Sequence, residues 1–203
     1  MEPRLLGWPT DGPTLRLDYR RYAYAGKFVM SGTGKAVLAP DGWEHEEADR
    51  TETDPGDGES TDSMESSVLA AVAFDVDRTD SDALRLRYVT VRDDRRGEGL
   101  GPRLCTFVCE RAAGREFERV RIAVNNPYSY EALYRAGFGF TGETTGIAEV
   151  VLERPAVEPA ARNPEQYRAG LDAVADREDL TDGEVAFARE KRERGPPGTT
   201  ATR

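Results

Sequence analysis

With 203 residues and a formal net charge of −10, the chain is long enough for one domain of about 150 residues with appendages. It has no apolar run near the ~20 residues of a membrane span and no signal-peptide core, so we expect a soluble, cytoplasmic protein with no membrane partner. Two cysteines, one histidine and no basic stripe disfavour a metal site, a disulfide framework and nucleic-acid binding.

The first residues predict little regular structure. Residues 1–13 contain three prolines and two glycines and are interpreted as an irregular lead-in. The alternation in 15–19 predicts the first strand. Residues 20–38 fit either a short helix or a continued strand, with a possible strand at 35–38.

An acidic segment follows. Residues 41–67 hold eleven acidic residues and a single arginine, which is the composition of a solvated loop. The alternative is that the segment attracts a cationic acceptor, although high salt would screen that attraction. Because lysine is nearly absent and arginine is abundant, we also expect a salt-adapted source, such as a halophilic archaeon.

A glycine-rich turn lies between a predicted strand and a predicted helix. The apolar run 68–74 predicts a strand buried on both faces, and 83–91 alternates as a second strand. Apolar residues at helical spacing then begin at Leu100 and predict a helix to about residue 112. Glycines 97, 99 and 101 stand between them. Such a turn at a helix start exposes unpaired N–H groups, which suit a phosphate ligand.

The spacing of this turn excludes two common phosphate-binding loops. It lacks the Gly-Lys-Ser/Thr ending of a Walker loop and the Gly-x-Gly-x-x-Gly of a dinucleotide fold. What remains is Arg-x-x-Gly-x-Gly (Arg96, Gly99, Gly101) after a Val-x-Val strand end (Val89, Val91). This pattern resembles the acetyl-CoA signature of the GNAT superfamily of N-acetyltransferases. The alternative is a surface turn in which glycine only provides flexibility.

A second block, within 120–142, extends the resemblance. An alternating strand at 120–124 precedes Asn125, Asn126 and a short helix that carries Leu133-Tyr134, and Gly137-Phe138 follows. The family pattern is Asn, Leu-Tyr and Gly-Phe in this order. Two spacings differ by one residue: the Tyr to Gly-Phe distance is shorter and the Asn to Tyr distance is longer. The resemblance covers roughly residues 68–154.

The resemblance implies a function for individual residues. Tyr134 would be the general acid, with Tyr128 and Tyr130 as rivals, and a backbone N–H near Val91 would stabilise the oxyanion. The exposed strand 89–91 would pair with the pantetheine arm, and Asn125 or Asn126 would hold that arm or only cap the helix. The implied cofactor-binding residues are Val89, Thr90, Val91, Arg96, Gly97, Glu98, Gly99, Leu100, Gly101, Pro102, Asn125 and Asn126.

The base that deprotonates the acceptor amine stays open. No histidine is available in the core, and the remaining candidates are water or one of Asp80, Asp82, Glu98, Glu143 and Glu149. The family places two helices between its first two strands, and these shape the acceptor site. Here that interval holds only ambiguous residues and the acidic segment, so the sequence leaves the acceptor unidentified.

The C-terminal part is predicted as a helical appendage, residues 155–203. Asn163 followed by proline predicts a helix start, with Tyr167, Leu171 and Val174 on one stripe. Thr181 or Asp182 would cap a second helix, and the end from residue 195 is expected to be disordered. These helices stabilise the core, form a homodimer contact or cover the cleft. Cys105 and Cys109, one helical turn apart, are interpreted as buried packing residues.

Together these features predict an α/β (α+β) domain at 14–154 with a mixed, mostly antiparallel sheet. The strands at 83–91 and 120–124 should run parallel, because a helix connects them. The predicted activity is acetyl transfer from acetyl-CoA to an amine of a small molecule or a protein. The alternatives are a coenzyme A-binding module without activity and a transferase of a longer acyl group.

Overall fold

The computed structural model describes residues 1–44 and 67–198. The predicted acidic loop therefore lies almost wholly outside the described residues, as does the end of the chain from residue 199. The strands are β1 (Glu2–Gly7), β2 (Gly34–Ala39), β3 (Ala70–Val76), β4 (Ala83–Val91), β5 (Arg119–Val124), β6 (Gly139–Thr144) and β7 (Val150–Pro155). The α-helices are α2 (Leu100–Ala113), α3 (Pro127–Arg135), α4 (Pro164–Ala175) and α5 (Asp182–Arg194), and the 3-10 helices are η1 (Ala25–Lys27) and η2 (Asp93–Arg95).

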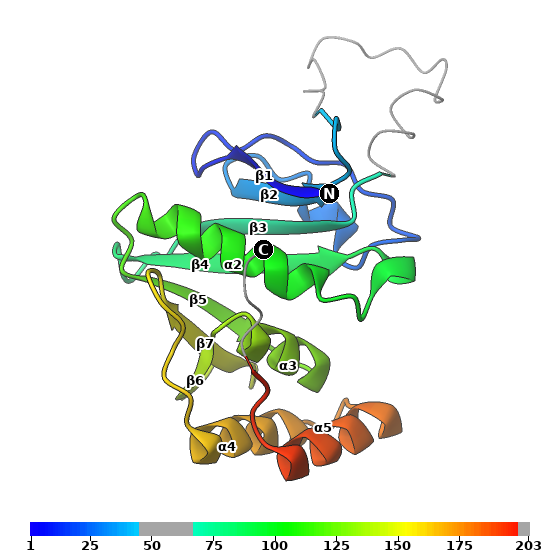
Figure 1. Cartoon of the computed structure of the whole chain (residues 1–203), viewed down its shortest axis with the longest axis vertical. Helices are drawn as coiled ribbons and strands as arrows, with labels where there is room; N and C mark the ends of the chain where they lie inside the picture. Colours follow the sequence, from blue (N-terminus) through cyan, green and yellow to red (C-terminus); the bar gives the residue numbers. More distant parts are fainter. Residues whose placement is uncertain (45–66, 199–203) are drawn as a thin grey trace. The chain divides into compact units, whose positions relative to one another are not determined.

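The strands form one seven-stranded sheet in the order β1-β2-β3-β4-β5-β7-β6 (Figure 1). The β1–β2, β2–β3, β5–β7 and β6–β7 pairs are antiparallel, whereas β4 and β5 are parallel. The chain between β4 and β5 passes through α2, as a parallel pair requires. The predicted α/β class, the mostly antiparallel sheet and its parallel pair are thus confirmed.

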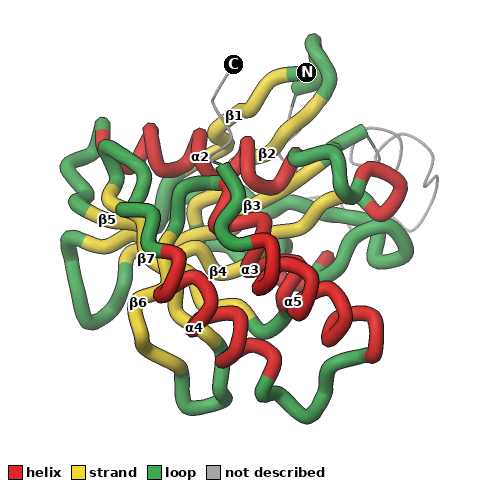
Figure 2. Tube along the Cα trace, turned by 60° about the horizontal axis from the view of Figure 1, so that its bottom comes forward, coloured by secondary structure: helices red, strands yellow, loops and turns green. Residues whose placement is uncertain are grey.

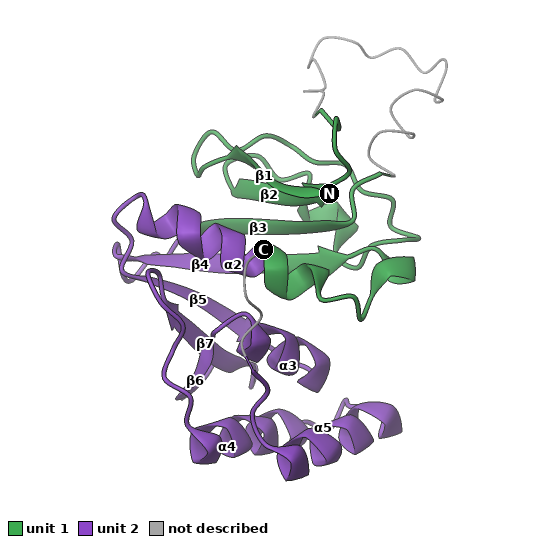
Figure 3. Cartoon of the chain, viewed as in Figure 1, with its two compact units in different colours: residues 1–75, 87–104 green, residues 76–86, 105–203 purple. Residues whose placement is uncertain are grey.

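The chain divides into two compact units (Figure 3). Unit 1 comprises 1–75 and 87–104, and unit 2 comprises 76–86 and 105–203. The division cuts β4 after Leu86 and α2 after Leu104, so each of these elements contributes to both units. The glycine-rich turn belongs to unit 1.

In unit 1, the interpretation of residues 1–13 as irregular is wrong for β1. Glu2 to Leu5 pair with Ala39 to Ala36 of β2. Pro3 is compatible with this strand because β1 lies at the sheet edge, where a missing N–H costs no ladder bond. The other two prolines lie beyond the strand, in the irregular chain that follows it.

The predicted strand at 15–19 is also wrong. Leu15 and Leu17 are buried in a core cluster with Tyr22 and Phe28, so the alternation correctly marks which side chains face inward. Their backbone joins no sheet, and the Leu15 N–H donates instead to the carbonyl of Phe28 at 3.0 Å. In the described part of the β1–β2 connection the single helical element is the three-residue η1.

Unit 2 places its three C-terminal α-helices together. Helices α3, α4 and α5 contact one another, and α4 also packs on β6 and β7 (Figure 2). The predicted stripe of α4 is buried, with Tyr167 and Val174 at 0% exposure and Leu171 at 1%. Both predicted helix starts are confirmed: Asn163 caps α4, and Thr181 forms a capping box with Glu184 on α5.

The two cysteines are free thiols buried on α2, as expected. Burial raises the pKa of Cys109 to about 11 and also raises that of Cys105. Across the two described ranges, none of the helices combines the length and the apolar character needed to cross a membrane.

Candidate functional site

The turn before α2 is built on two glycines with left-handed backbone. Gly97 has φ +84° and Gly99 has φ +78°, a region that costs a residue with a Cβ about 1–2 kcal/mol. A Cβ added at either position would meet no atom within 4 Å. The glycines are therefore needed for the backbone conformation, and they leave open space on the outside of the turn.

The N–H groups of this turn remain available to a ligand. The Arg103 N–H donates to the Gly99 carbonyl at 3.2 Å, whereas the N–H groups of residues 97–101 make no backbone hydrogen bond within the described chain. Pro102 has no N–H to satisfy. Several unpaired donors at the positive end of a 14-residue helix are suited to an anion.

Charged side chains around the turn are paired with each other at the surface. Arg96 pairs with Asp93 while both side chains stay more than half exposed, and Arg95 binds Glu98 through two contacts of 2.7 Å. Exposed pairs of this kind contribute little and exchange easily for a ligand. Arg96 can therefore turn to an anion held by the turn.

Within residues 1–44 and 67–198, no strand pairs with the second half of β4 on its β5 side. β4 pairs with β5 from Ala83 to Leu86 only. The continuation, 87–91, lies in unit 1 and includes the predicted pantetheine strand. Thr90 there is 3% exposed, and its hydroxyl has no partner among the described residues. Val91 lies against the first turn of α2, since a Cβ on Gly101 would be 3.5 Å from its Cγ2.

In unit 2, the two predicted asparagines have a structural task. The Asn126 side chain accepts from the Ser129 N–H at 2.9 Å and caps α3, and its amide donates to Asn125 Oδ1 at 3.1 Å. The helix-cap interpretation is confirmed for Asn126. A further role of either residue in holding the pantetheine arm stays a prediction.

All three tyrosines of α3 face the C-terminal helices. The Tyr128 ring lies 4.5 Å from that of Phe187 on α5, and the Tyr130 hydroxyl donates to the Tyr167 carbonyl at 3.0 Å. Tyr134 is 1% exposed, and its hydroxyl lies 3.5 Å from the Asn163 carbonyl. This hydrogen bond is longer than those of the Tyr130 and Tyr167 hydroxyls, so the Tyr134 proton is less firmly held than theirs.

Two of the candidate bases are held in ion pairs that weaken them. A hydrogen bond from Arg119 holds the pKa of Asp80 below its ordinary value, and Arg95 does the same to the pKa of Glu98. A carboxylate with a lowered pKa is a poorer proton acceptor. The Glu149 carboxylate accepts a 3.4 Å hydrogen bond from the Thr145 hydroxyl, and the Glu149 N–H donates to Thr145 Oγ1 at 3.2 Å. Its carboxylate is therefore less committed than those of Asp80 and Glu98.

Sequence reasoning missed two arginines of unit 2 that carry buried guanidinium nitrogens. Arg154 on β7 is 4% exposed and lies beside Cys109, while its Nε and one terminal nitrogen have no hydrogen-bond partner in the described chain. Arg162, just before α4, places its guanidinium carbon 4.4 Å from the Tyr134 ring centroid. Neither residue belongs to a motif, and only their position in the fold reveals them.

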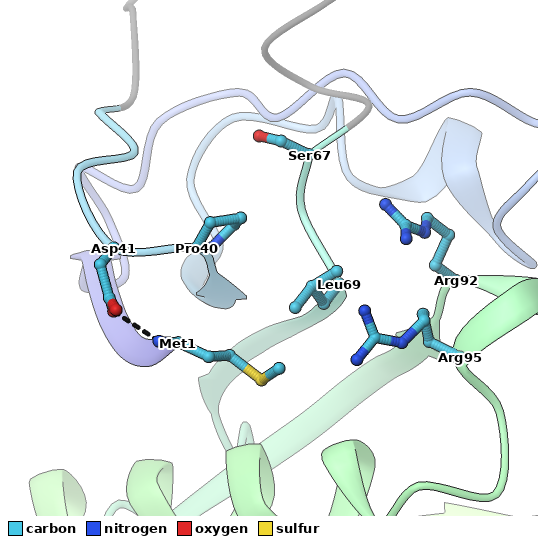
Figure 4. Close-up of a pocket in the computed structure, with 7 residues that line it drawn as sticks. All are labelled: Met1, Pro40, Asp41, Ser67, Leu69, Arg92 and Arg95. Atoms are coloured by element: carbon cyan, nitrogen blue, oxygen red, sulfur yellow. Dashed lines mark hydrogen bonds and ion pairs between the residues drawn. The ribbon is translucent and has the colours of Figure 1, made fainter.

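An open pocket of about 390 Å³ lies in unit 1, beside the end of β4 (Figure 4). Its lining consists of Met1, Pro40, Asp41, Ser67, Leu69, Arg92 and Arg95. Arg92 binds Asp94 through two contacts, Arg95 binds Glu98, and the Met1 amine pairs with Asp41. None of the predicted site residues lines this pocket, and its cations already have carboxylate partners.

The structure therefore gathers the predicted residues into two groups. The glycine turn, Arg96 and the pantetheine strand lie in unit 1, and the two asparagines and Tyr134 lie in unit 2. The turn has the geometry that the sequence predicts. The sequence did not reveal that the C-terminal appendage contacts Tyr134 through residues 162–167.

Comparison with known proteins shows the family of the chain. The family model described as "Acetyltransferase (GNAT) family" matches residues 33–140, more than half of the chain. A comparison with curated protein sequences gives no significant match.

Solved structures also resemble the chain. A putative N-acetyltransferase from Lactobacillus plantarum is 17% identical with a TM-score of 0.43, and the match covers 63% of this chain and 71% of that one. Nourseothricin acetyltransferase is 14% identical with a TM-score of 0.46, and the match covers 76% of this chain and 98% of that one. An N-acetyltransferase from Thermoplasma acidophilum in complex with coenzyme A is 13% identical with a TM-score of 0.38. That match covers 44% of this chain and 55% of that one. These similarities are too low to bear on the acceptor.

Proposed function

The chain belongs to the acetyltransferase (GNAT) family and is an acyltransferase, and from this premise we propose that it transfers an acetyl group from acetyl-CoA to an amine. The observation that carries the proposal is the turn at 97–101. Its N–H groups are unpaired within the described chain, and two of its glycines leave open space where a side chain would stand. This fits a pyrophosphate approaching the backbone.

The proposed binding residues act as follows. The N–H groups of Gly97, Glu98, Gly99, Leu100 and Gly101 hold the pyrophosphate, with Arg96 as a movable counter-charge and Pro102 starting the helix. The backbone of Val89, Thr90 and Val91 aligns the pantetheine arm as an added strand, for which this edge of β4 has free groups. The Val91 N–H stabilises the oxyanion, and Asn125 and Asn126 support the arm from the start of α3.

For proton transfer we propose Tyr134 rather than its two neighbours. The Tyr130 hydroxyl is committed to the Tyr167 carbonyl, and burial raises the pKa of Tyr130, so it retains its proton. Tyr128 is half exposed against Phe187. Tyr134 releases only a 3.5 Å contact when it turns to the leaving thiolate.

The acceptor is proposed to be a small-molecule or protein amine. The described β1–β2 connection holds a single 3-10 turn, so an acceptor site there is built from irregular chain. No α-helix lies in the described part of this connection. A cytoplasmic location, a halophilic archaeal source and a homodimer stay predictions.

The test is release of coenzyme A thiol from acetyl-CoA in the presence of a panel of amines, with the acetylated product confirmed by mass spectrometry. The proposal predicts turnover with at least one amine and none without an amine. Tight binding of acetyl-CoA with no turnover for any amine would favour the inactive coenzyme A-binding module instead. Turnover only with a longer acyl-CoA would favour a transferase of a longer acyl group.

A further inference from the structure

Arg162 is a partly buried residue, and its two terminal guanidinium nitrogens are buried without an acceptor in the described chain. Its guanidinium carbon lies 4.4 Å from the Tyr134 ring centroid. Buried polar groups are nearly always hydrogen-bonded, so each such exception needs an explanation. Among the described residues, the guanidinium instead lies over the ring face of Tyr134.

The segment that carries Arg162 also holds the Tyr134 hydroxyl. Asn163, the next residue, accepts the 3.5 Å contact from Tyr134 with its carbonyl, while its side chain caps α4 through the N–H groups of Glu165 and Gln166. The cap fixes the backbone of Asn163, so its carbonyl is held beside the Tyr134 hydroxyl while binding it only loosely. Residues 162 and 163 lie outside the range that the family model matches.

A cation over the ring changes how readily the phenol gives up its proton. An arginine on an aromatic face is attracted to the ring, and the attraction grows when the ring becomes a phenolate. In a buried site this interaction is poorly screened. Arg162 therefore stabilises the state that Tyr134 reaches on donating its proton.

We propose that Arg162 is a positioning residue for proton transfer, which holds Tyr134 in place and stabilises the phenolate formed when Tyr134 protonates the leaving thiolate. This rests on the proposed function. In the balanced step the amine nitrogen bonds to the acetyl carbon, the carbon–sulfur bond breaks, and the Tyr134 proton passes to sulfur. The amine loses one proton to solvent, and Tyr134 recovers one from solvent.

The other charged and titratable groups of the cluster do not take over this task. On α3 these are Tyr130, Glu131 and Arg135, and on α4 the group is Tyr167. The Tyr167 hydroxyl donates to Glu131 at 2.6 Å, and Arg135 pairs with the same carboxylate at 3.3 Å. Burial raises the pKa of Tyr167 and of Tyr130, so both stay protonated. Glu131 opposes formation of a phenolate nearby, which makes the cation of Arg162 more necessary.

The test compares Arg162→Met with Arg168→Met. The second substitution removes a partly exposed α4 arginine whose Nε donates to the Arg192 carbonyl. The methionine keeps much of the stem of Arg162 and removes the charge. Using the best amine of the panel, kcat should fall about tenfold with little change in KM, and Arg162→Lys should retain most activity. Because kcat needs the protonated phenol and the cation stabilises the phenolate, the basic limb of the kcat profile should differ between Arg162→Met and the wild type, and Arg168→Met should leave it unchanged.

A spectroscopic titration makes the proposal testable without turnover. Ultraviolet absorbance should show one phenol per chain that ionises at higher pH in Arg162→Met than in the wild type, and this difference should vanish on a Tyr134→Phe background. If Arg162→Met only lowered the melting temperature, and changed neither the pH profile of kcat nor the absorbance titration, Arg162 would be purely structural. That result would overturn the proposal. Full kcat in Tyr134→Phe would also overturn it, while acetyl transfer itself would stand. Absence of thiol release with every amine would instead refute the proposed function.

Discussion

The Arg103 N–H donates to the carbonyl of Gly99 at 3.2 Å, so the hydrogen bonding of α2 begins at a residue with φ +78°. This relationship places the donors of the preceding turn outside the helix. It follows that the turn has N–H groups to offer only while residue 99 keeps its left-handed backbone.

Arg96 should contribute an electrostatic part of coenzyme affinity that salt removes. We expect Arg96→Gln to raise the Kd for coenzyme A about three- to tenfold at low salt, because a charge next to the phosphates is lost. In ~1 M salt the Debye length is about 3 Å, and the difference from the wild type should shrink. Calorimetric titration measures both values. Arg78→Gln, in the exposed β3–β4 turn, is the control, and an equal effect of both substitutions would contradict a local role of Arg96.

The packing of α4 on α3 depends on the absence of a side chain at Gly170. A Cβ there would lie 2.2 Å from the Tyr130 hydroxyl and 2.7 Å from its ring. We therefore expect Gly170→Ala to lower the free energy of unfolding by about 1–3 kcal/mol, despite the better helix propensity of alanine.

Gly183 on α5 is the matched control for this substitution. The nearest atom to a Cβ there is the Tyr128 hydroxyl at 3.8 Å, which is an ordinary contact. Gly183→Ala should be neutral or stabilise by up to about 1 kcal/mol. Denaturant unfolding of both variants measures the difference, and an unchanged midpoint in Gly170→Ala would show that α4 does not pack on Tyr130 as described.

Such close packing explains what could not be read from the sequence. The glycine turn, the strand before it and the caps of α4 and α5 are local signals, set by backbone geometry over a few residues, and the structure bears them out. The stripe Tyr167, Leu171 and Val174 gave the buried face of α4 but not its partner. That partner is chosen by shape, through the fit of Tyr130 into the space over Gly170, which no local pattern contains.

The errors at the N-terminus have a similar cause. The alternation of Leu15 and Leu17 reports which side chains face the core, and burial alone satisfies it without strand pairing. Conversely, β1 was missed because Pro3 argues against a strand unless the strand lies at a sheet edge. Strand order is a long-range property, and the sequence around residue 3 does not encode it.

The ion pair between Asp80 and Arg119 in unit 2 should make stability depend on acid pH. Their atoms lie 2.8 Å apart, and the hydrogen bond from Arg119 lowers the pKa of Asp80 below 3.8. A carboxylate whose pKa is lower in the folded state adds stability above its unfolded pKa and loses it as the pH falls through the folded pKa. The free energy of unfolding should thus fall below about pH 4.

Asp80→Asn should remove this part of the acid dependence, and Arg119→Met should remove the same part. The double variant should then resemble either single variant, because both delete one interaction. Urea unfolding between pH 2.5 and 6 measures the slopes. If the slope of Asp80→Asn equalled that of the wild type, the pair would not hold the carboxylate as the structure shows.

The most direct test of the account is calorimetric titration of acetyl-CoA and coenzyme A into the wild type, Gly99→Glu and Gly142→Glu, in high-salt buffer. Gly142 is the matched control, since it has φ +89° and no atom within 4 Å of an added Cβ, as Gly99 does, but lies on β6. The account predicts micromolar binding by the wild type and by Gly142→Glu, and loss of at least tenfold in affinity for folded Gly99→Glu. No binding by the folded wild type, or equal affinities of the two variants, would contradict it.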